Sequence, residues 1–127
     1  MLILNHPCIR PLNLVRISSQ EQITHSLPSD FLLLSCDSFT QTLALARFCN
    51  SNTLAYASFV RNTKEALFLV NLNVRFLLCR EIHLAKTLQK LAETYLFDAK
   101  ILLCIQEEQE IEKTAECGID GVIFANL

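Results

Sequence analysis

Glycine, proline and tryptophan are nearly missing from this chain, which has two glycines, three prolines and no tryptophan among 127 residues. This excludes collagen-like, low-complexity and disordered chains, which are rich in glycine or proline and poor in apolar residues. Apolar residues make up 51% of the sequence instead. A chain of this length buries roughly two-thirds of its unfolded surface, and no linker interrupts it. We therefore expect a single α/β domain over residues 1–127.

The scarcity of glycine also excludes several common sites. The two glycines, Gly118 and Gly121, lie close together near the end of the sequence. The glycine-rich loops that hold nucleotide phosphates, G-x-G-x-x-G and G-x-x-x-x-G-K-[ST], are therefore missing. The G-x-S-x-G turn of serine hydrolases and the H-E-x-x-H zinc helix do not occur either. We expect no cofactor, no metal and no recognised catalytic constellation.

Basic clusters and long apolar runs are lacking too. The net charge is −2, and the eleven Lys and Arg residues are scattered, so nucleic acid is not an expected partner. No run reaches the roughly 18 residues that a membrane span needs, and no basic segment leads into an apolar one as in a signal peptide. We expect a cytoplasmic protein without a membrane partner.

Cysteine, by contrast, is frequent, with six residues, none of them in a Cys-x-x-Cys pair. Cys36, Cys79 and Cys104 lie at or in apolar runs. A core of this size needs no covalent links, so we interpret the cysteines as free thiols used as small apolar residues in a reducing compartment.

Six short apolar runs alternate along the chain with segments of helical character. The runs are Leu14–Ile17, Phe31–Ser35, Leu54–Val60, Phe76–Cys79, Ile101–Ile105 and Val122–Ala125. They do not alternate between polar and apolar residues, which is typical of parallel strands covered on both faces. Met1–Leu4 is a candidate for a further edge strand. Residues 83–97 carry one apolar stripe at the helical period, as a surface helix packed on a sheet does.

Polar residues mark where several helices begin and end. Ser18 with Glu21 and Ser38 with Gln41 have the spacing of capping boxes, and Asn62 is a candidate cap for the helix that Glu65 enters. Asn73 and Gly118 are the residue types that best tolerate the left-handed turn ending a helix.

Two architectures fit this order of elements. The one we favour is a three-layer, flavodoxin- or Rossmann-like fold, with a mainly parallel sheet of five to six strands and helices on both faces. The alternative is a partial (half) β/α barrel. In that form, one face of the sheet would be uncovered, and we expect it to be hidden by dimerisation.

Two stretches resemble βα units of phosphate-binding TIM barrels of the indole-glycerol-phosphate synthase and thiamine-phosphate synthase type. They are residues 63–78 and residues 107–124, the latter with its ending Ala-Glu-Cys-Gly-Ile-Asp-Gly-Val-Ile-Phe. The resemblance covers under half of the chain, and the chain has too few strands for eight units. Those barrels place a glycine-rich phosphate loop after late strands, where this chain has Phe124-Ala125-Asn126. The catalytic Lys and Glu of those enzymes have no counterpart here.

In parallel sheets, ligands bind at the carboxyl ends of the strands, so we expect the polar residues that follow the runs to line a site. Two arginines near helix starts suit a phosphate or carboxylate. The candidate ligand-binding residues are Asp37, Arg61, Asn62, Arg80, Glu81 and Asn126. The other interpretation is that the acids and Asn62 only cap helices and that the arginines pair with acids.

A thiol site is a further hypothesis. Cys36 and Cys79 each close a run, near a helix start that lowers a thiol's pKa, and His83 is the nearest candidate base. A metal site from these three residues lacks recognised ligand spacing.

These observations favour a non-catalytic module that binds a partner or a small ligand. The alternative is a small enzyme, or a degenerate barrel relative, acting on an anionic, phosphorylated metabolite through Arg61 and Arg80. A homodimer is a further prediction, because the apolar segment 66–70 includes Phe68 and offers a surface to a second subunit.

Overall fold

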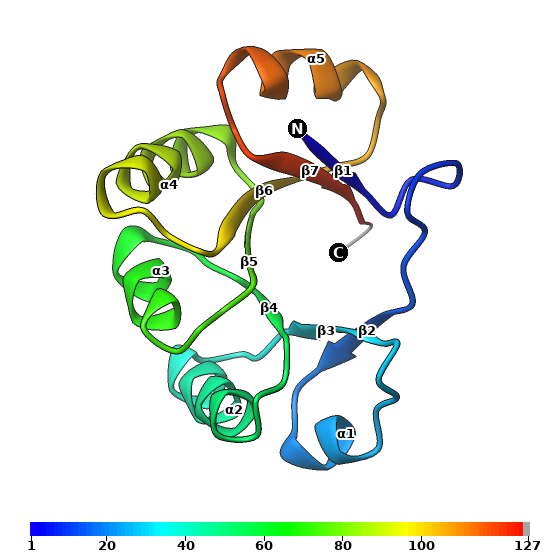
Figure 1. Ribbon diagram of the computed structural model, residues 1–127, viewed down its shortest axis with the longest axis vertical. Helices are drawn as coiled ribbons and strands as arrows, with labels where there is room; N and C mark the ends of the chain where they lie inside the picture. Colours follow the sequence, from blue (N-terminus) through cyan, green and yellow to red (C-terminus); the bar gives the residue numbers. More distant parts are fainter. Residues whose placement is uncertain (126–127) are drawn as a thin grey trace.

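The computed structural model describes residues 1–125, and in this part of the chain seven strands form one sheet in the order β1-β7-β6-β5-β4-β3-β2 (Figure 1). All neighbouring strands run parallel. The strands are β1 (Leu2–Leu4), β2 (Leu14–Ile17), β3 (Phe31–Leu34), β4 (Ala57–Phe59), β5 (Phe76–Cys79), β6 (Lys100–Ile105) and β7 (Gly121–Phe124). The helices are α1 (Gln20–Thr24), α2 (Phe39–Ser51), α3 (Thr63–Val70), α4 (Ile82–Tyr95) and α5 (Gln109–Glu116).

The sheet curls into a half-barrel with the five helices around its outside (Figure 1). From β2 to β7 each strand lies beside the one before it in the chain, so the order never reverses. A doubly wound fold needs such a reversal to place helices on its second face. The predicted α/β fold with a parallel sheet is therefore confirmed, in the form of its alternative, the partial barrel. The additional strand is β1, at the predicted edge.

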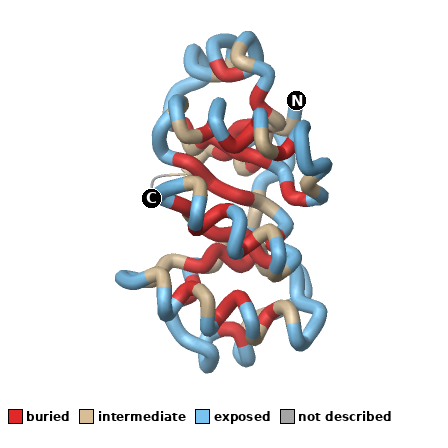
Figure 2. The backbone as a smooth tube through the Cα atoms, turned by 90° about the vertical axis from the view of Figure 1, so that its left-hand side faces the viewer, coloured by how far each residue is buried: buried red, intermediate tan, exposed pale blue. Residues whose placement is uncertain are grey.

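The curled sheet encloses a core of its own on the concave face. Six residues from six strands, all at most 4% exposed, form this inner cluster: Leu4, Leu33, Ala57, Leu78, Leu102 and Ile123. The strand residues next to these six in sequence, such as Leu77 and Leu103, face the helices. Figure 2 shows burial concentrated along the strands. Both faces of the sheet are buried within one chain, which explains why polar and apolar residues do not alternate along the strands. The curl of the sheet buries the face that we expected dimerisation to cover.

A connecting segment crosses the opening between the edge strands β1 and β2 (Figure 1). Asn5, with φ of 61°, turns the chain after β1. Its Nδ2 donates to the carbonyl of Phe124 at 2.8 Å, and its Oδ1 accepts from the amide of Leu12 at 3.0 Å. The side chain of Leu12 packs against the inner cluster. Residues 5–13 thus take the place where a closed barrel would continue its sheet.

Most of the predicted helix boundaries are found. Asn73 (φ 59°) and Gly118 (φ 72°) adopt the left-handed conformation after α3 and α5, as predicted. Ser38 and Asn62 cap α2 and α3 by accepting from the backbone amides three residues on. The predicted capping box of Ser18 with Glu21 is wrong, because the observed box lies one residue later in the sequence.

Helix α1 starts at Gln20, so Ser19 is its N-cap, and its hydroxyl accepts from the amide of Gln22. The side chain of Gln22 accepts from the amide of Ser19 in return. Strand β4 is also shorter than predicted, because Leu54 and Ala55 are exposed and precede the sheet.

The segment Gly118-Ile119-Asp120-Gly121 connects neighbouring elements of the fold through Asp120. The carboxylate of Asp120 accepts from the amide of Ile101 at 2.9 Å and from the side chain of Gln89 at 3.1 Å. Gln89 is buried, and its carbonyl accepts from the amide of Asp120. This network ties the starts of β6 and β7 to α4, at the amino edge of the sheet. Among the described residues, no helix is long and apolar enough to cross a membrane.

Candidate functional site

A small hollow lies at the carboxyl ends of β3, β4 and β5, beside the start of α2. Its volume is about 80 Å³. It is lined by Leu34, Ser35, Cys36, Ser38, Phe39, Thr42, Phe59, Arg61, Glu65 and Arg80. Two of the predicted site residues, Arg61 and Arg80, are thus brought together at the predicted edge of the sheet.

Arg80 provides the clearest feature of this hollow. It follows β5 and is exposed, and its guanidinium carbon lies 3.9 Å from the centroid of the Phe59 ring. A guanidinium stacked on an aromatic face keeps its N–H donors at the edge available for another partner. Within residues 1–125 no acid pairs with Arg80, and no protein acceptor takes its side-chain hydrogens. Its charge is therefore fixed in place and not neutralised by the described part of the protein.

Arg61 is held differently, by an acid in the first turn of the following helix, α3. Its Nη2 lies 2.9 Å from the carboxylate of Glu65, which is buried and also accepts from the backbone amide of Arg61 at 3.0 Å. The hydrogen bond between the two side chains and the charge of Glu65 raise the pKa of Arg61. Asn62 is occupied in capping α3. The sequence also allowed that Asn62 only caps a helix and that the arginines only pair with acids. For Asn62 and Arg61, these are the contacts that the structure shows.

Arg16 is a third arginine at this edge, and the sequence reasoning missed it. It lies on β2 opposite Leu33 of the inner cluster, so it belongs to the concave face. Its Nη2 donates to the hydroxyl of Ser35 at 2.7 Å, and Ser35 lines the hollow. The available signal was a charged residue inside an otherwise apolar run.

The remaining predicted residues do not line the hollow. Asp37 is exposed in the turn before α2, and Glu81 is the exposed N-cap of α4, without a side-chain capping bond. They lie at the predicted edge but are not gathered with Arg61 and Arg80. Asn126 lies outside the described residues.

The other half of the carboxyl edge uses its polar groups internally. His6 Nε2 lies 2.7 Å from the carboxylate of Glu108, and the His6 ring meets the edge of Phe124 at 5.1 Å between centroids. The carboxylate of Glu110 accepts from the amides of Gln106 and Glu107. These contacts close the β6–β7 side, so the arginine hollow lies on the β3–β5 side alone.

Burial argues against a thiol site at Cys79. This residue is 0% exposed, and burial raises the pKa of its thiol to about 12. Burial likewise raises the pKa of Cys104 to about 12, although the positive charge of Arg80 acts in the opposite direction. His83 is exposed on α4. The predicted role of Cys79 as a nucleophile therefore lacks the thiolate that it requires.

We expect alkylation to follow this order of burial. At pH 8, iodoacetamide should modify the exposed Cys8 about a hundredfold faster than Cys79, because the thiolate is the reacting form and Cys79 is enclosed. Mass spectrometry of peptides over a time course measures both rates. Equal rates in the folded protein would contradict the buried position of Cys79.

Within residues 1–125, no three His, Cys, Asp or Glu side chains are grouped as a metal site requires. A comparison of the sequence with models of known families and with curated proteins gives no match. The case for a function therefore rests on the geometry of this chain.

Proposed function

We propose that this protein is a non-catalytic module that binds a small anion at the carboxyl ends of β3, β4 and β5. The observation that carries the proposal is Arg80, stacked on Phe59 and unpaired within the described residues. An exposed arginine that forms no ion pair usually moves freely in solvent. Here the Phe59 ring holds the Arg80 guanidinium beside the hollow. Because the side chain is already ordered, binding an anion does not cost the entropy of ordering it.

The surroundings of Arg80 suit a negative charge. Arg61 contributes a second guanidinium that is 65% exposed, although it shares its charge with Glu65. Arg16 contributes a third through its bond to Ser35. The one acid that lines the hollow, Glu65, is already engaged by Arg61. The local balance is thus positive in a protein whose net charge is −2.

The size of the hollow limits what it holds. Its volume of about 80 Å³ is small beside the roughly 300–1,000 Å³ of sites that enclose a whole small molecule. This is room for one phosphate or carboxylate group but not for a whole metabolite. The rest of the ligand would extend into solvent or toward the exposed Asp37 and Glu81.

Titration calorimetry with inorganic phosphate tests this proposal. Arg80→Ala should weaken binding about tenfold, because a hydrogen bond to a charged group stabilises a complex by roughly that factor. Arg47→Ala is the matched control, since Arg47 is an exposed arginine on α2 that does not line the hollow. Equal affinities for the wild-type protein and Arg80→Ala would remove the basis for the site.

A small enzyme acting on a phosphorylated metabolite is the second candidate. The barrel-like form favours it, because β/α barrels carry their active sites at the carboxyl ends of the strands. The same arginines would bind the substrate phosphate, and the hydroxyls of Ser35, Ser38 and Thr42 and the thiol of Cys36 line the same hollow. Release of phosphate from a panel of sugar phosphates, lost in Arg80→Ala, would favour the enzyme over the binding module.

Self-association through α3 also stays a prediction. Leu67 and Phe68 are 37% and 50% exposed, and the Phe68 ring lies 6.0 Å from that of Phe39. Because the concave face is closed within one chain, dimerisation would use this outer surface. Light scattering that shows only monomer at high concentration would exclude it.

A further inference from the structure

The amino end of the half-barrel contains a second and larger cavity, which neither the proposed function nor the resemblance uses. Its volume is about 300 Å³, at the lower end of the range for small-molecule sites. It is lined by Leu4, Arg10, Leu12, Asp30, Phe31, Leu32, Ala55, Tyr56, Ala57, Arg75 and Phe76. We call this cavity the amino-end well.

The walls of the amino-end well are apolar. The rings of Phe31 and Phe76, which both line the well, stack at 5.6 Å between centroids. Ala57 is the smallest member of the inner cluster, and Leu12 comes from the segment that crosses the opening of the sheet. Ala57 lies on β4, between the strands that carry Phe31 and Phe76, so its small side chain leaves space between them.

Two arginines stand at the rim of this apolar space. The guanidinium of Arg75 lies 5.7 Å from the centroid of Phe76, and Arg10 is exposed in a left-handed backbone conformation with φ of 44°. This conformation is unfavourable for a non-glycine residue, and a hydrogen bond from the amide of Asn5 to the carbonyl of Arg10 stabilises it. Neither arginine pairs with an acid within residues 1–125.

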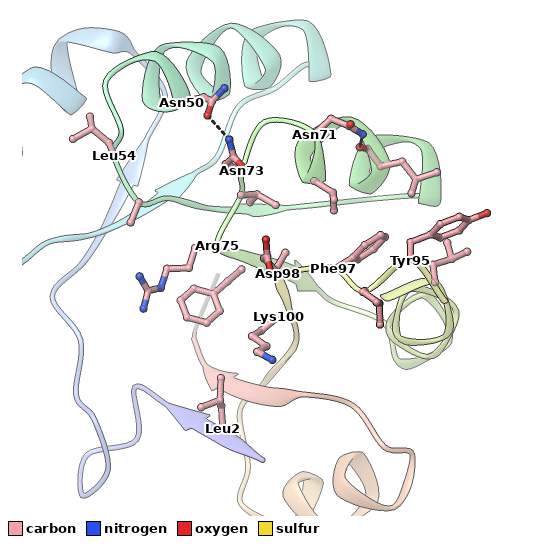
Figure 3. A pocket seen from close by; sticks show the side chains of 18 of the residues that line it. Leu2, Asn50, Leu54, Asn71, Asn73, Arg75, Tyr95, Phe97, Asp98 and Lys100 are labelled. Carbon is pink, nitrogen blue, oxygen red and sulfur yellow. Dashed lines mark hydrogen bonds between the residues drawn. The ribbon is translucent and has the colours of Figure 1, made fainter. Parts of the chain in front are cut away.

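The acids near the rim form no ion pair with these arginines within residues 1–125. The carboxylate of Asp30 accepts from the side chain of Asn13 and, at 2.8 Å, from the amide of Leu27. Asp98 lines the adjoining groove, where Lys100 adds a further positive charge. This groove, about 1260 Å³ in volume, shares Arg10, Ala55, Arg75 and Phe76 with the well. Figure 3 shows it, with Arg75, Asp98 and Lys100 around the ends of the strands.

We propose that the amino-end well binds an amphipathic anion, such as a medium-chain carboxylate. The chain lies among Leu12, Phe31 and Phe76, and the head group accepts hydrogen bonds from Arg10 and Arg75. An apolar cavity with a few convergent charged groups is the usual composition of a small-ligand site. The exposed apolar groove beyond the rim, with Tyr95 and Leu96 68% and 81% exposed, accommodates a ligand longer than the well.

Titration calorimetry with octanoate tests this site. The wild-type protein should bind octanoate, and Arg75→Gln and Arg10→Gln should each weaken binding about tenfold. Octanol, which lacks the charge, and acetate, which lacks the chain, should bind far more weakly. Arg47→Gln is the matched control, because Arg47 is exposed and lines neither the well nor the arginine hollow, and it should leave octanoate binding unchanged. Arg80→Gln shows separately whether the carboxylate binds in the arginine hollow instead.

A second variant tests the apolar part. Ala55 is exposed and lines both the well and the groove, so Ala55→Phe narrows the entrance without disturbing the core, and octanoate binding should weaken. Absence of octanoate binding to the wild-type protein would overturn the proposal. Binding that survives both arginine substitutions, or that is lost in Arg80→Gln instead, would overturn it as well. Loss in Arg80→Gln would assign the carboxylate to the arginine hollow, whereas the results for Arg10→Gln, Arg75→Gln and Ala55→Phe do not bear on phosphate binding at Arg80.

Discussion

Replacing Leu102 by alanine is expected to lower the free energy of unfolding by about 3 kcal/mol. Leu102 is 0% exposed at the centre of the inner cluster, where neighbours from β5 and β7 contact it. The cost combines the lost transfer of apolar surface with the cavity that remains, because a curled sheet with strands on both sides has little freedom to collapse into the space. Urea unfolding followed by circular dichroism measures the change.

Two control variants make this experiment specific to the concave face. Leu77→Ala removes an equally buried leucine from the helix-covered face and should cost a similar amount. Leu27→Ala removes a leucine that is 62% exposed and should change stability by less than about 0.5 kcal/mol. If Leu102→Ala resembled Leu27→Ala while Leu77→Ala remained costly, the concave face would not be a closed core.

Gly121→Val is the second substitution with a large expected effect. A Cβ at this position would lie 2.6 Å from the carbonyl oxygen of Leu2, 2.8 Å from its Cβ and 2.9 Å from Cδ2 of Leu102. Gly121 pairs with Leu2 in the sheet, so β1 would have to separate from β7. We expect a loss of about 3 kcal/mol in the free energy of unfolding, with faster amide exchange at Ile3 and Leu4.

Gly118→Ala separates this steric effect from ordinary backbone strain. Gly118 has φ of 72°, and a Cβ there would meet nothing within 4 Å. Its replacement should cost about 1 kcal/mol, from the left-handed backbone alone, and should leave amide exchange in β1 unchanged. A Gly121→Val protein as stable as Gly118→Ala would contradict the close approach of β1 to β7.

The parallel sheet was predictable from the sequence, but its curvature was not. Runs such as Phe76–Cys79 are apolar on both faces whether helices or a curled sheet cover the second face, so the pattern is the same for the layered and the barrel form. The curl depends on a strand order that never reverses. The pairing of β1 with β7, where Gly121 lies against Leu2, likewise joins residues 119 positions apart in sequence.

The candidate site was predictable only in part, for a related reason. Arg61 and Arg80 follow strands, and the rule that ligands bind at carboxyl ends locates them correctly. The stacking of Arg80 on Phe59 joins a residue that follows β5 to a residue on β4, and no local pattern indicates it. The same rule directs attention away from the amino ends, so the cavity at Arg10 and Arg75 could not be found before the fold was known.

Nuclear magnetic resonance with a ¹⁵N-labelled protein, titrated with inorganic phosphate, tests anion binding at the arginine hollow most directly. We predict saturable shifts at the side-chain Nε–H of Arg80 and at the amides of Ser35 and Cys36, which line the hollow. The signals of Arg47 and of Asn71, at the opposite edge, should stay constant. Unchanged Arg80, Ser35 and Cys36 signals in a folded protein, or shifts spread evenly over all exposed arginines, would contradict the account.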